Sequence, residues 1–240
     1  LLAIAIQKWD LHKRIALFVL ERAGSNGASL VLGFMLTAAV ISMWVMNTAT
    51  TIMLLPIGLA VVTVVKETVK GLSEKETENF QLSLLLGIAY GATIGGMSTL
   101  IGTGPNGMLA AFMADNYDLD ISFIDWMKVG VPLSAIMLPS SWFVLTRIIY
   151  PVRFKTSEET RTLLSSMKEE LGEFQGPEVK VFMVFLLTAL CWMLRTVLDD
   201  LPGLGGLSDA GIAMISAMLL FLLPSGDKET KGPLLEWEDA

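Results

Sequence analysis

Long stretches without a charged residue alternate with short charged stretches along this chain. The two longest apolar runs cover residues 23–65 and 79–114, and shorter ones follow towards the C-terminus. A helix that crosses a bilayer needs roughly 20 mainly apolar residues. The pattern therefore predicts an all-α polytopic membrane protein.

The run 23–65 does not fit a simple crossing, because basic residues flank both of its ends. Basic flanks favour the cytoplasm, so both ends are expected on the same side. The run is polar in its middle, at Asn47-Thr48-Ala49-Thr50-Thr51. It is either a re-entrant hairpin of two half-depth helices with a polar tip, or two full spans joined by a polar turn. We favour the hairpin, because two spans of about 20 residues would leave hardly any residues for the turn.

The remaining segments follow from the same pattern. Residues 1–22 are expected to hold the end of a transmembrane helix and an amphipathic helix on the cytoplasmic surface. We then expect the hairpin at 23–65, a cytoplasmic loop at 66–78, a broken transmembrane helix at 79–114, transmembrane helices at 123–150, 181–198 and 207–224, a cytoplasmic segment at 151–180 and a cytoplasmic tail at 225–240. The chain opens in apolar residues without an initiator Met, so we expect it to be a fragment of a longer protein.

Charged loops set the expected orientation. The loops 114–120 and 199–209 contain no Lys or Arg, whereas the other loops are basic. The positive-inside rule therefore places these two loops outside and the basic segments in the cytoplasm. Lys70, Arg161 and Lys228 are expected at the cytoplasmic face, and Asp118 and Asp200 at the outer face.

Composition supports a membrane protein and excludes several soluble classes. Hydrophobic residues make up 53% of the chain and charged residues 17%, whereas a soluble domain carries about 25% charge. A soluble enzyme, a nucleic-acid binder and a secreted disulfide scaffold are excluded. The lipid bilayer, in a plasma (inner) membrane, is the expected environment. The single cysteine, Cys191, cannot form a disulfide framework, and the single histidine, His12, cannot form a metal site alone.

Two polar breaks inside the apolar runs are where chemistry is expected. In the first, a helix ending near Met46 would leave carbonyls beside the Ser42 hydroxyl and the Asn47 amide oxygen, which are hard oxygen ligands for a small cation. A second helix starting near Ala49 would offer N–H groups to an anion. The second break, Gly102-Thr103-Gly104-Pro105-Asn106, unwinds a helix through glycine and proline. Paired discontinuous helices are typical of a transporter's midplane site.

Neither break contains Arg, Lys, Asp, Glu or His. An anionic substrate would be neutralised there by hydroxyls, amides, helix N-termini and co-bound cations. Proton relays and voltage sensors need titratable groups in the membrane, and intramembrane proteases need His or Asp partners, so we do not expect an enzyme. A structural membrane subunit whose Ser, Thr and Gly residues only pack helices is the remaining alternative. It explains two such breaks less well.

At these residues the sequence resembles the divalent anion/sodium symporter family, the sodium-dependent dicarboxylate, citrate and sulfate carriers. The similar motifs are SMWVMNTATTIMLLPIG at 42–58, IAYGATIGGMSTLIGTGPN at 88–106, LHKRIAL at 11–17 and LLEWEDA at 234–240. The resemblance implies an elevator-type transporter of two inverted repeats, each with a re-entrant helical hairpin and a broken transmembrane helix. It also implies a homodimer. This chain would hold one repeat, with the second repeat missing beyond its tail.

The resemblance further implies the function and the site. The function is secondary active transport of small di- or tricarboxylate anions, coupled to sodium. The sodium ligands would be Ser42, Asn47 and the carbonyl of Gly102, and the substrate-binding residues would be Asn47, Thr48, Thr103, Pro105 and Asn106. Met46 stands where the family has Ser, and Gly104 where it has Pro. Because Met46 removes a hydroxyl, the alternative is a sodium-independent anion exchanger, or a permease for sulfate or another oxyanion.

Overall fold

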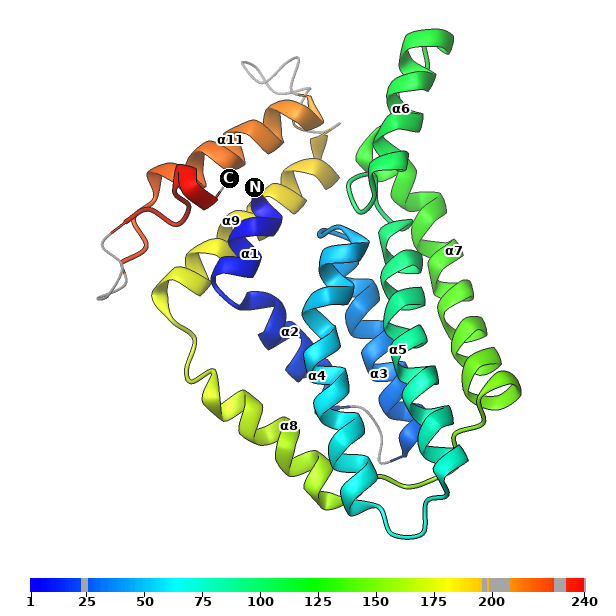
Figure 1. Ribbon diagram of the computed structural model, residues 1–240. Coiled ribbons are helices and arrows are strands. Elements are labelled where there is room, and N and C mark those ends of the chain that lie inside the picture. Colours follow the sequence, from blue (N-terminus) through cyan, green and yellow to red (C-terminus); the bar gives the residue numbers. More distant parts are fainter. Residues whose placement is uncertain (23–25, 196–197, 199–207, 227–231, 240) are drawn as a thin grey trace. The chain divides into compact units, whose positions relative to one another are not determined.

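The computed structural model describes residues 1–22, 26–195, 198, 208–226 and 232–239 (Figure 1). Apart from two isolated bridges, the regular elements of these residues are helices, which confirms the predicted all-α class. They group into two compact units. The first contains Leu1–His12, Ser122–Asp125 and Glu173–Ala240, and the second contains Lys13–Ile121 and Trp126–Gly172.

Three helices of the described residues are long and apolar enough to cross a membrane. They are α4 (Asn47–Thr68), α7 (Phe123–Phe143) with its π-helical continuation η1 (Val144–Ile149), and α9 (Gly176–Met193). The helices α3 (Gly27–Ser42) and α11 (Asp209–Leu222) are apolar but shorter. The segments predicted as transmembrane helices at 123–150, 181–198 and 207–224 overlap α7 with η1, α9 and α11, of which α11 is shorter than a full span, and their crossing of the membrane stays a prediction.

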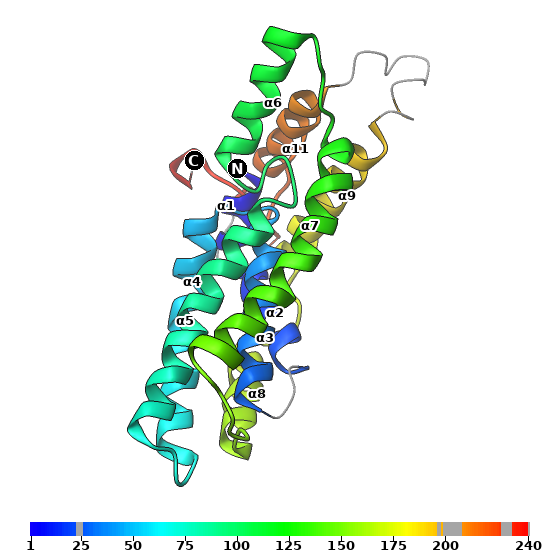
Figure 2. The same ribbon diagram turned by 90° about the vertical axis from the view of Figure 1, so that its right-hand side faces the viewer.

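The hairpin predicted at 23–65 is formed by α3 and α4, which residues 43–46 connect (Figures 1 and 2). α3 has 16 residues and α4 has 22. At a rise of 1.5 Å per residue their lengths are roughly 24 and 33 Å. Because the hydrocarbon core is about 30 Å thick, α3 is too short to cross it upright. α4 is long enough to cross, so it is not the half-depth helix we predicted, and the re-entrant hairpin stays a prediction.

α5 (Glu74–Gly96) packs along α3 in the same direction, and glycines permit the close approach. A Cβ atom on Gly91 would lie 2.5 Å from the carbonyl oxygen of Met35, and one on Gly95 would lie 2.6 Å from the carbonyl carbon of Ala39. Small residues are used in this way where membrane helices pack backbone to backbone. The C-terminal ends of α3 and α5 therefore reach the same level.

α7 covers another side of the C-terminal end of α5 (Figure 2). The indole Nε1 of Trp126 donates to the Met97 carbonyl at 3.0 Å, and the Ser134 hydroxyl donates to the Ile94 carbonyl at 2.8 Å. A Cβ on Gly130 would lie 2.7 Å from the Met97 oxygen, so only glycine permits this contact. The residues that follow α5 are thus held between α3 and α7.

We predicted a loop over the charged segment 66–78, but helices extend into this segment from both ends. α4 continues to Thr68 and α5 begins at Glu74, because Ser73 and Glu76 form a capping box. Their side chains accept each other's backbone N–H groups, which stabilises a helix start. α9 also begins before the predicted position 181, because the carboxylate of Glu178 accepts a hydrogen bond from the Gln175 N–H at 3.0 Å.

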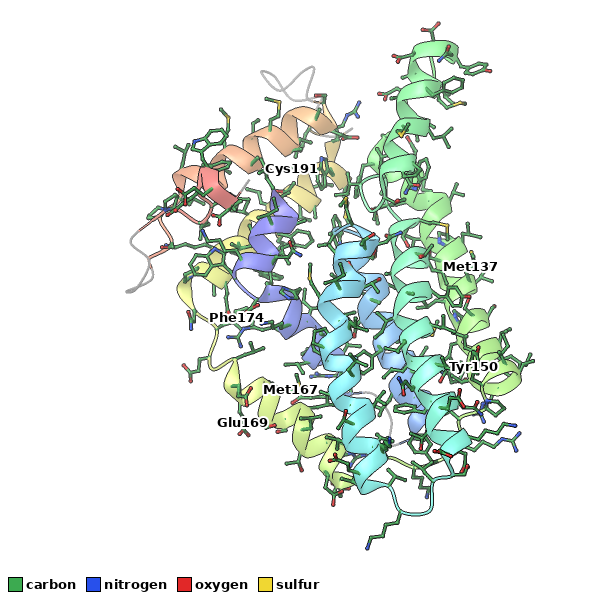
Figure 3. All side chains as sticks on the ribbon, in the orientation of Figure 1. Met137, Tyr150, Met167, Glu169, Phe174 and Cys191 are labelled. Carbon is green, nitrogen blue, oxygen red and sulfur yellow. The ribbon has the colours of Figure 1, made fainter. Side chains whose placement is uncertain are left out.

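The amphipathic helix predicted within residues 1–22 is α2 (Leu11–Leu20), and a shorter helix, α1 (Leu2–Lys8), precedes it. α8 (Glu158–Glu170) lies in the segment 151–180, and Met167 and Glu169 mark it in Figure 3. Arg14 of α2 donates to the carbonyls of Leu171 and Gly172 at 2.9 and 2.8 Å. These bonds join α2 to the C-terminal end of α8.

The described end of the chain is not a free polar tail. Leu234 and Leu235 are fully buried, and the indole of Trp9 donates to the Leu234 carbonyl at 2.9 Å. Lys8 contacts Asp239 at 2.5 Å, and this hydrogen bond holds the pKa of Asp239 below its ordinary value. Residues 23–25, 196–197, 199–207, 227–231 and 240 lie outside the described residues, and with them the orientations predicted for Asp200 and Lys228.

Candidate cation and anion site

The tip of the hairpin is a four-residue turn between two helix ends. α3 ends at Ser42 and not near Met46, and α4 begins at Asn47 and not near Ala49. Both helix ends therefore lie earlier in the chain than we predicted. The turn between them is closed by hydrogen bonds from the N–H groups of Trp44 and Val45 to the Ile41 carbonyl. Asn47 therefore occupies the first turn of α4. Its amide oxygen accepts a hydrogen bond from the buried Ser42 hydroxyl at 2.7 Å.

A break also interrupts the run 79–114, at residues 97–103. It lies earlier than the predicted Gly102–Asn106, because Pro105 is tolerated in the first turn of a helix and Gly104, Pro105 and Asn106 already belong to the helix that follows. α5 ends at Gly96, and α6 (Gly104–Tyr117) begins after the break. Within it, the Thr99 hydroxyl donates to the Met43 carbonyl of the hairpin tip at 2.5 Å and accepts from the Gly102 N–H at 3.1 Å. The break is therefore tied to the tip rather than free of it.

Tip and break meet at two glycines. A Cβ on Gly96 would overlap the amide oxygen of Asn47, and a Cβ on Gly102 would lie 2.5 Å from the Gly96 carbonyl oxygen and 2.8 Å from that of Ser42. The carbonyls of Ser42 and Gly96, the Ser42 hydroxyl and the Asn47 amide oxygen thus gather around these glycines. Uncharged oxygens of this kind are ligands that hard cations prefer.

Two helix N-termini open beside this oxygen cluster. The residue before α4 is Met46 and the one before α6 is Thr103, and neither side chain caps its helix. Uncapped N-terminal N–H groups carry partial positive charge and bind anions. α6 offers fewer of them than α4, because Pro105 has no N–H and the Asn106 N–H donates to the Thr103 carbonyl at 3.2 Å. Thr48 and Pro105 are exposed and Thr103 is half-buried, so an anion can reach both helix ends.

The structure brings together the residues predicted for the cation, namely Ser42, Asn47 and Gly102. Asn106 has a different environment from the one expected of a substrate contact. It is buried, and its amide nitrogen donates to the carbonyls of Gly96 and Thr99 at 3.0 and 2.8 Å. Its predicted contact with substrate stays a prediction, while its bonds favour a role in holding the break.

Sequence reasoning missed two residues of this arrangement. Gly96 is one of them, because nothing in the sequence connects it with Asn47, although its missing side chain makes room for the Asn47 amide. Thr99 was not singled out at all. The signal that could have found it is a polar residue inside a helix break, where the backbone no longer satisfies its own hydrogen bonds.

Residues 1–240 match the family model described as the sodium:sulfate symporter transmembrane region. The chain belongs to this family. This match confirms the resemblance inferred from the two motifs, and with the apolar helices it makes the chain part of an integral, multi-pass membrane protein.

Two curated relatives cover the whole chain. The sodium-dependent dicarboxylate transporter SdcS of Staphylococcus saprophyticus is 35% identical over 242 residues, which are 100% of this chain and 47% of the relative. The protein of the same name from Staphylococcus aureus is 33% identical over 242 residues, which are 100% of this chain and 46% of the relative. The chain therefore spans about half the length of these relatives.

Proposed function

We propose that this chain forms one repeat of a secondary active transporter that carries small di- or tricarboxylate anions together with sodium. The observation that carries the proposal is the oxygen cluster around Gly96 and Gly102, which lies beside two uncapped helix N-termini. The relatives, which are named sodium-dependent dicarboxylate transporters, support the same cargo.

Sodium would bind the cluster through the Ser42 hydroxyl, the Asn47 amide oxygen and the Gly102 carbonyl. The Ser42 hydroxyl lies within hydrogen-bond distance of the Asn47 amide oxygen, at 2.7 Å, and of the Val45 carbonyl, at 3.3 Å. With a cation bound between Ser42 and Asn47, the hydroxyl would donate to the Val45 carbonyl instead of to Asn47.

The substrate carboxylate would bind next to the ion, at the N-termini of α4 and α6. Thr48 and Thr103 offer hydroxyls there, and the Asn47 amide presents an NH2 group as well as its oxygen. One side chain would thus touch both cargoes. A bound cation lowers the electrostatic cost of the anion, and this supports symport. The elevator motion and the homodimer implied by the resemblance stay predictions.

Met46 favours one second candidate, a sodium-independent exchanger. Its side chain is 66% exposed at the hairpin tip, and its thioether is a poor ligand for a hard cation. A cluster that lacks this ligand could bind sodium too weakly to drive uptake. Exchange of internal for external anion would then replace the sodium gradient as the driving force.

The test is uptake of labelled succinate, citrate and sulfate by the natural-length protein in proteoliposomes, with sodium or choline outside. Asn47→Ala is compared with Asn116→Ala, which removes an exposed amide that bonds only to its own helix. We expect uptake to require sodium and to be lost in Asn47→Ala alone. Sodium-independent uptake stimulated by internal anion would favour the exchanger. Equal uptake by the two variants would reject the role of Asn47.

A further inference from the structure

Thr99 occupies a unique position between the two halves of the site. It is fully buried in the break after α5, and its hydroxyl is 56 residues along the chain from the carbonyl it donates to. Because the same hydroxyl accepts from the Gly102 N–H, one oxygen atom joins the hairpin tip to the loop that carries the Gly102 carbonyl.

These two bonds fix the backbone on both sides of the oxygen cluster. Met43 directly follows Ser42 in the chain. The hydrogen bond to the Met43 carbonyl therefore also restrains the Ser42 carbonyl, which belongs to the preceding peptide group. Holding the Gly102 nitrogen places the Gly102 α-carbon against the Ser42 and Gly96 carbonyls, where only glycine fits. Thr99 therefore orients groups proposed as sodium ligands without being one of them.

Asn106 braces the same loop from the side of α6. Its amide donates to the Gly96 carbonyl, the last of α5, and to the carbonyl of Thr99 itself. The first turn of α6 is thereby tied to the end of α5 and to the first part of the break. From the side of α7, Trp126 donates to the Met97 carbonyl. Side-chain hydrogen bonds from two directions thus hold the backbone of the break.

Shape matters here because the proposed ligands are neutral. A cation bound by carboxylates gains from charge even when the distances are imperfect. A cation bound by carbonyl, hydroxyl and amide oxygens depends on how many of them it reaches at once, and sites of this kind need their ligands held to about 0.5 Å. Loss of the bonds that orient the loop should therefore weaken sodium binding more than substrate binding.

We infer that Thr99 is a positioning residue that sets the sodium affinity of the site by clamping the hairpin tip to the break, with Asn106 as its support. The inference rests on the proposed sodium-coupled transport. It adds that sodium affinity is controlled by a residue that touches neither the ion nor the anion.

The experiment uses the natural-length protein in proteoliposomes, with succinate uptake measured over a sodium series. Thr99→Val keeps the shape and removes both hydrogen bonds, and Thr99→Ser keeps the hydroxyl. The matched control is Thr146→Val. Thr146 is an equally buried threonine of the same unit whose hydroxyl bonds only to Trp142 of the same turn, at 2.8 Å.

We expect Thr99→Val to raise the sodium concentration for half-maximal uptake by about tenfold, the scale of a lost buried hydrogen bond. Its maximal rate at saturating sodium should stay near that of the native protein, and Thr99→Ser should restore the native sodium curve. Thr146→Val should leave that curve unchanged.

Several results would overturn the inference. One is a sodium curve for Thr99→Val that matches the Thr146→Val curve. Another is a lower maximal rate with unchanged sodium affinity. Failure of Thr99→Val to fold, with Thr99→Ser and Thr146→Val folded, would make the Thr99 hydroxyl a requirement of the fold and not of the site. If instead uptake by the native protein and by every variant did not depend on sodium, both the proposed symport and the inference would be rejected. If uptake by the native protein depends on sodium and Thr99→Val has the same sodium curve, the proposed symport is supported and only the role of Thr99 is rejected.

Discussion

Replacing Gly96 with alanine is the smallest change that should disable the site while leaving the fold intact. A Cβ at position 96 would overlap the amide oxygen of Asn47 and lie 3.0 Å from its Cγ. In a helix, alanine is normally more favourable than glycine by up to about 1 kcal/mol. The local clash therefore reverses the effect expected from helix propensity.

The size of the effect follows from what has to move. Carbon atoms pack at about 3.5–4.0 Å, so the Asn47 amide must shift by roughly 1 Å or rotate away. The displaced atom is the end of a side chain, so the backbones of α4 and α5 need not separate. Overpacking costs about 1–3 kcal/mol. A central value of about 2 kcal/mol corresponds to a roughly thirtyfold weaker site, since 1.4 kcal/mol is tenfold.

Gly107→Ala provides the matched control. Gly107 lies in α6, and a Cβ built there would meet no atom within 4 Å. We expect Gly107→Ala to transport normally, and Gly96→Ala to be folded but to need roughly thirtyfold more sodium for half-maximal uptake, or to take up no substrate. The assay is sodium-dependent uptake with thermal unfolding measured in parallel. Sodium curves that coincide for the two variants would show that the Asn47 amide is not part of the cation site.

Three further substitutions test the surrounding structure. Gly95→Ala should reduce the yield of folded protein, measured by size-exclusion chromatography, because its Cβ would strike the backbone of Ala39 rather than a side chain; a normal yield would contradict the close helix contact. Met46→Ser should lower the sodium concentration for half-maximal uptake by roughly tenfold or more by restoring a hydroxyl at the tip; an unchanged sodium curve would exclude position 46 from the cation site. Arg14→Gln should lower the unfolding temperature by a few degrees, since it weakens charge-assisted bonds to Leu171; an unchanged temperature would show that this bond adds no stability.

The sequence predicted the helices well because lipid imposes a simple rule. Backbone groups in the hydrocarbon core must be satisfied within a helix, so an apolar run of sufficient length becomes one. The helix ends were predicted less well. The capping box of Ser73 and Glu76 could have been read from the sequence, but charge density made the segment resemble a loop.

The site was predictable only in its outline. A polar tip and a glycine-rich break mark where two helices stop, and the residues there suggest oxygen ligands. The bond from Thr99 to the Met43 carbonyl could not be predicted, because it depends on how far α5 slides along α3. That register is set by the contacts of Gly91 and Gly95 with the α3 backbone, and a shift of one turn would separate Thr99 from the tip.

The same geometry is consistent with a site that has no charged residue and yet binds the two oppositely charged cargoes proposed for it. At the tip, α3 ends in carbonyls and α4 begins in N–H groups, and the same pairing recurs where α5 ends and α6 begins. Helix ends of both signs thus lie next to each other, with Asn47 between them. Serine is a favoured N-cap residue and could occupy an N–H group of α4 itself. The Met46 side chain cannot accept such a hydrogen bond, so the N–H groups of α4 stay available to an anion. The same residue deprives the proposed cation site of one hydroxyl oxygen.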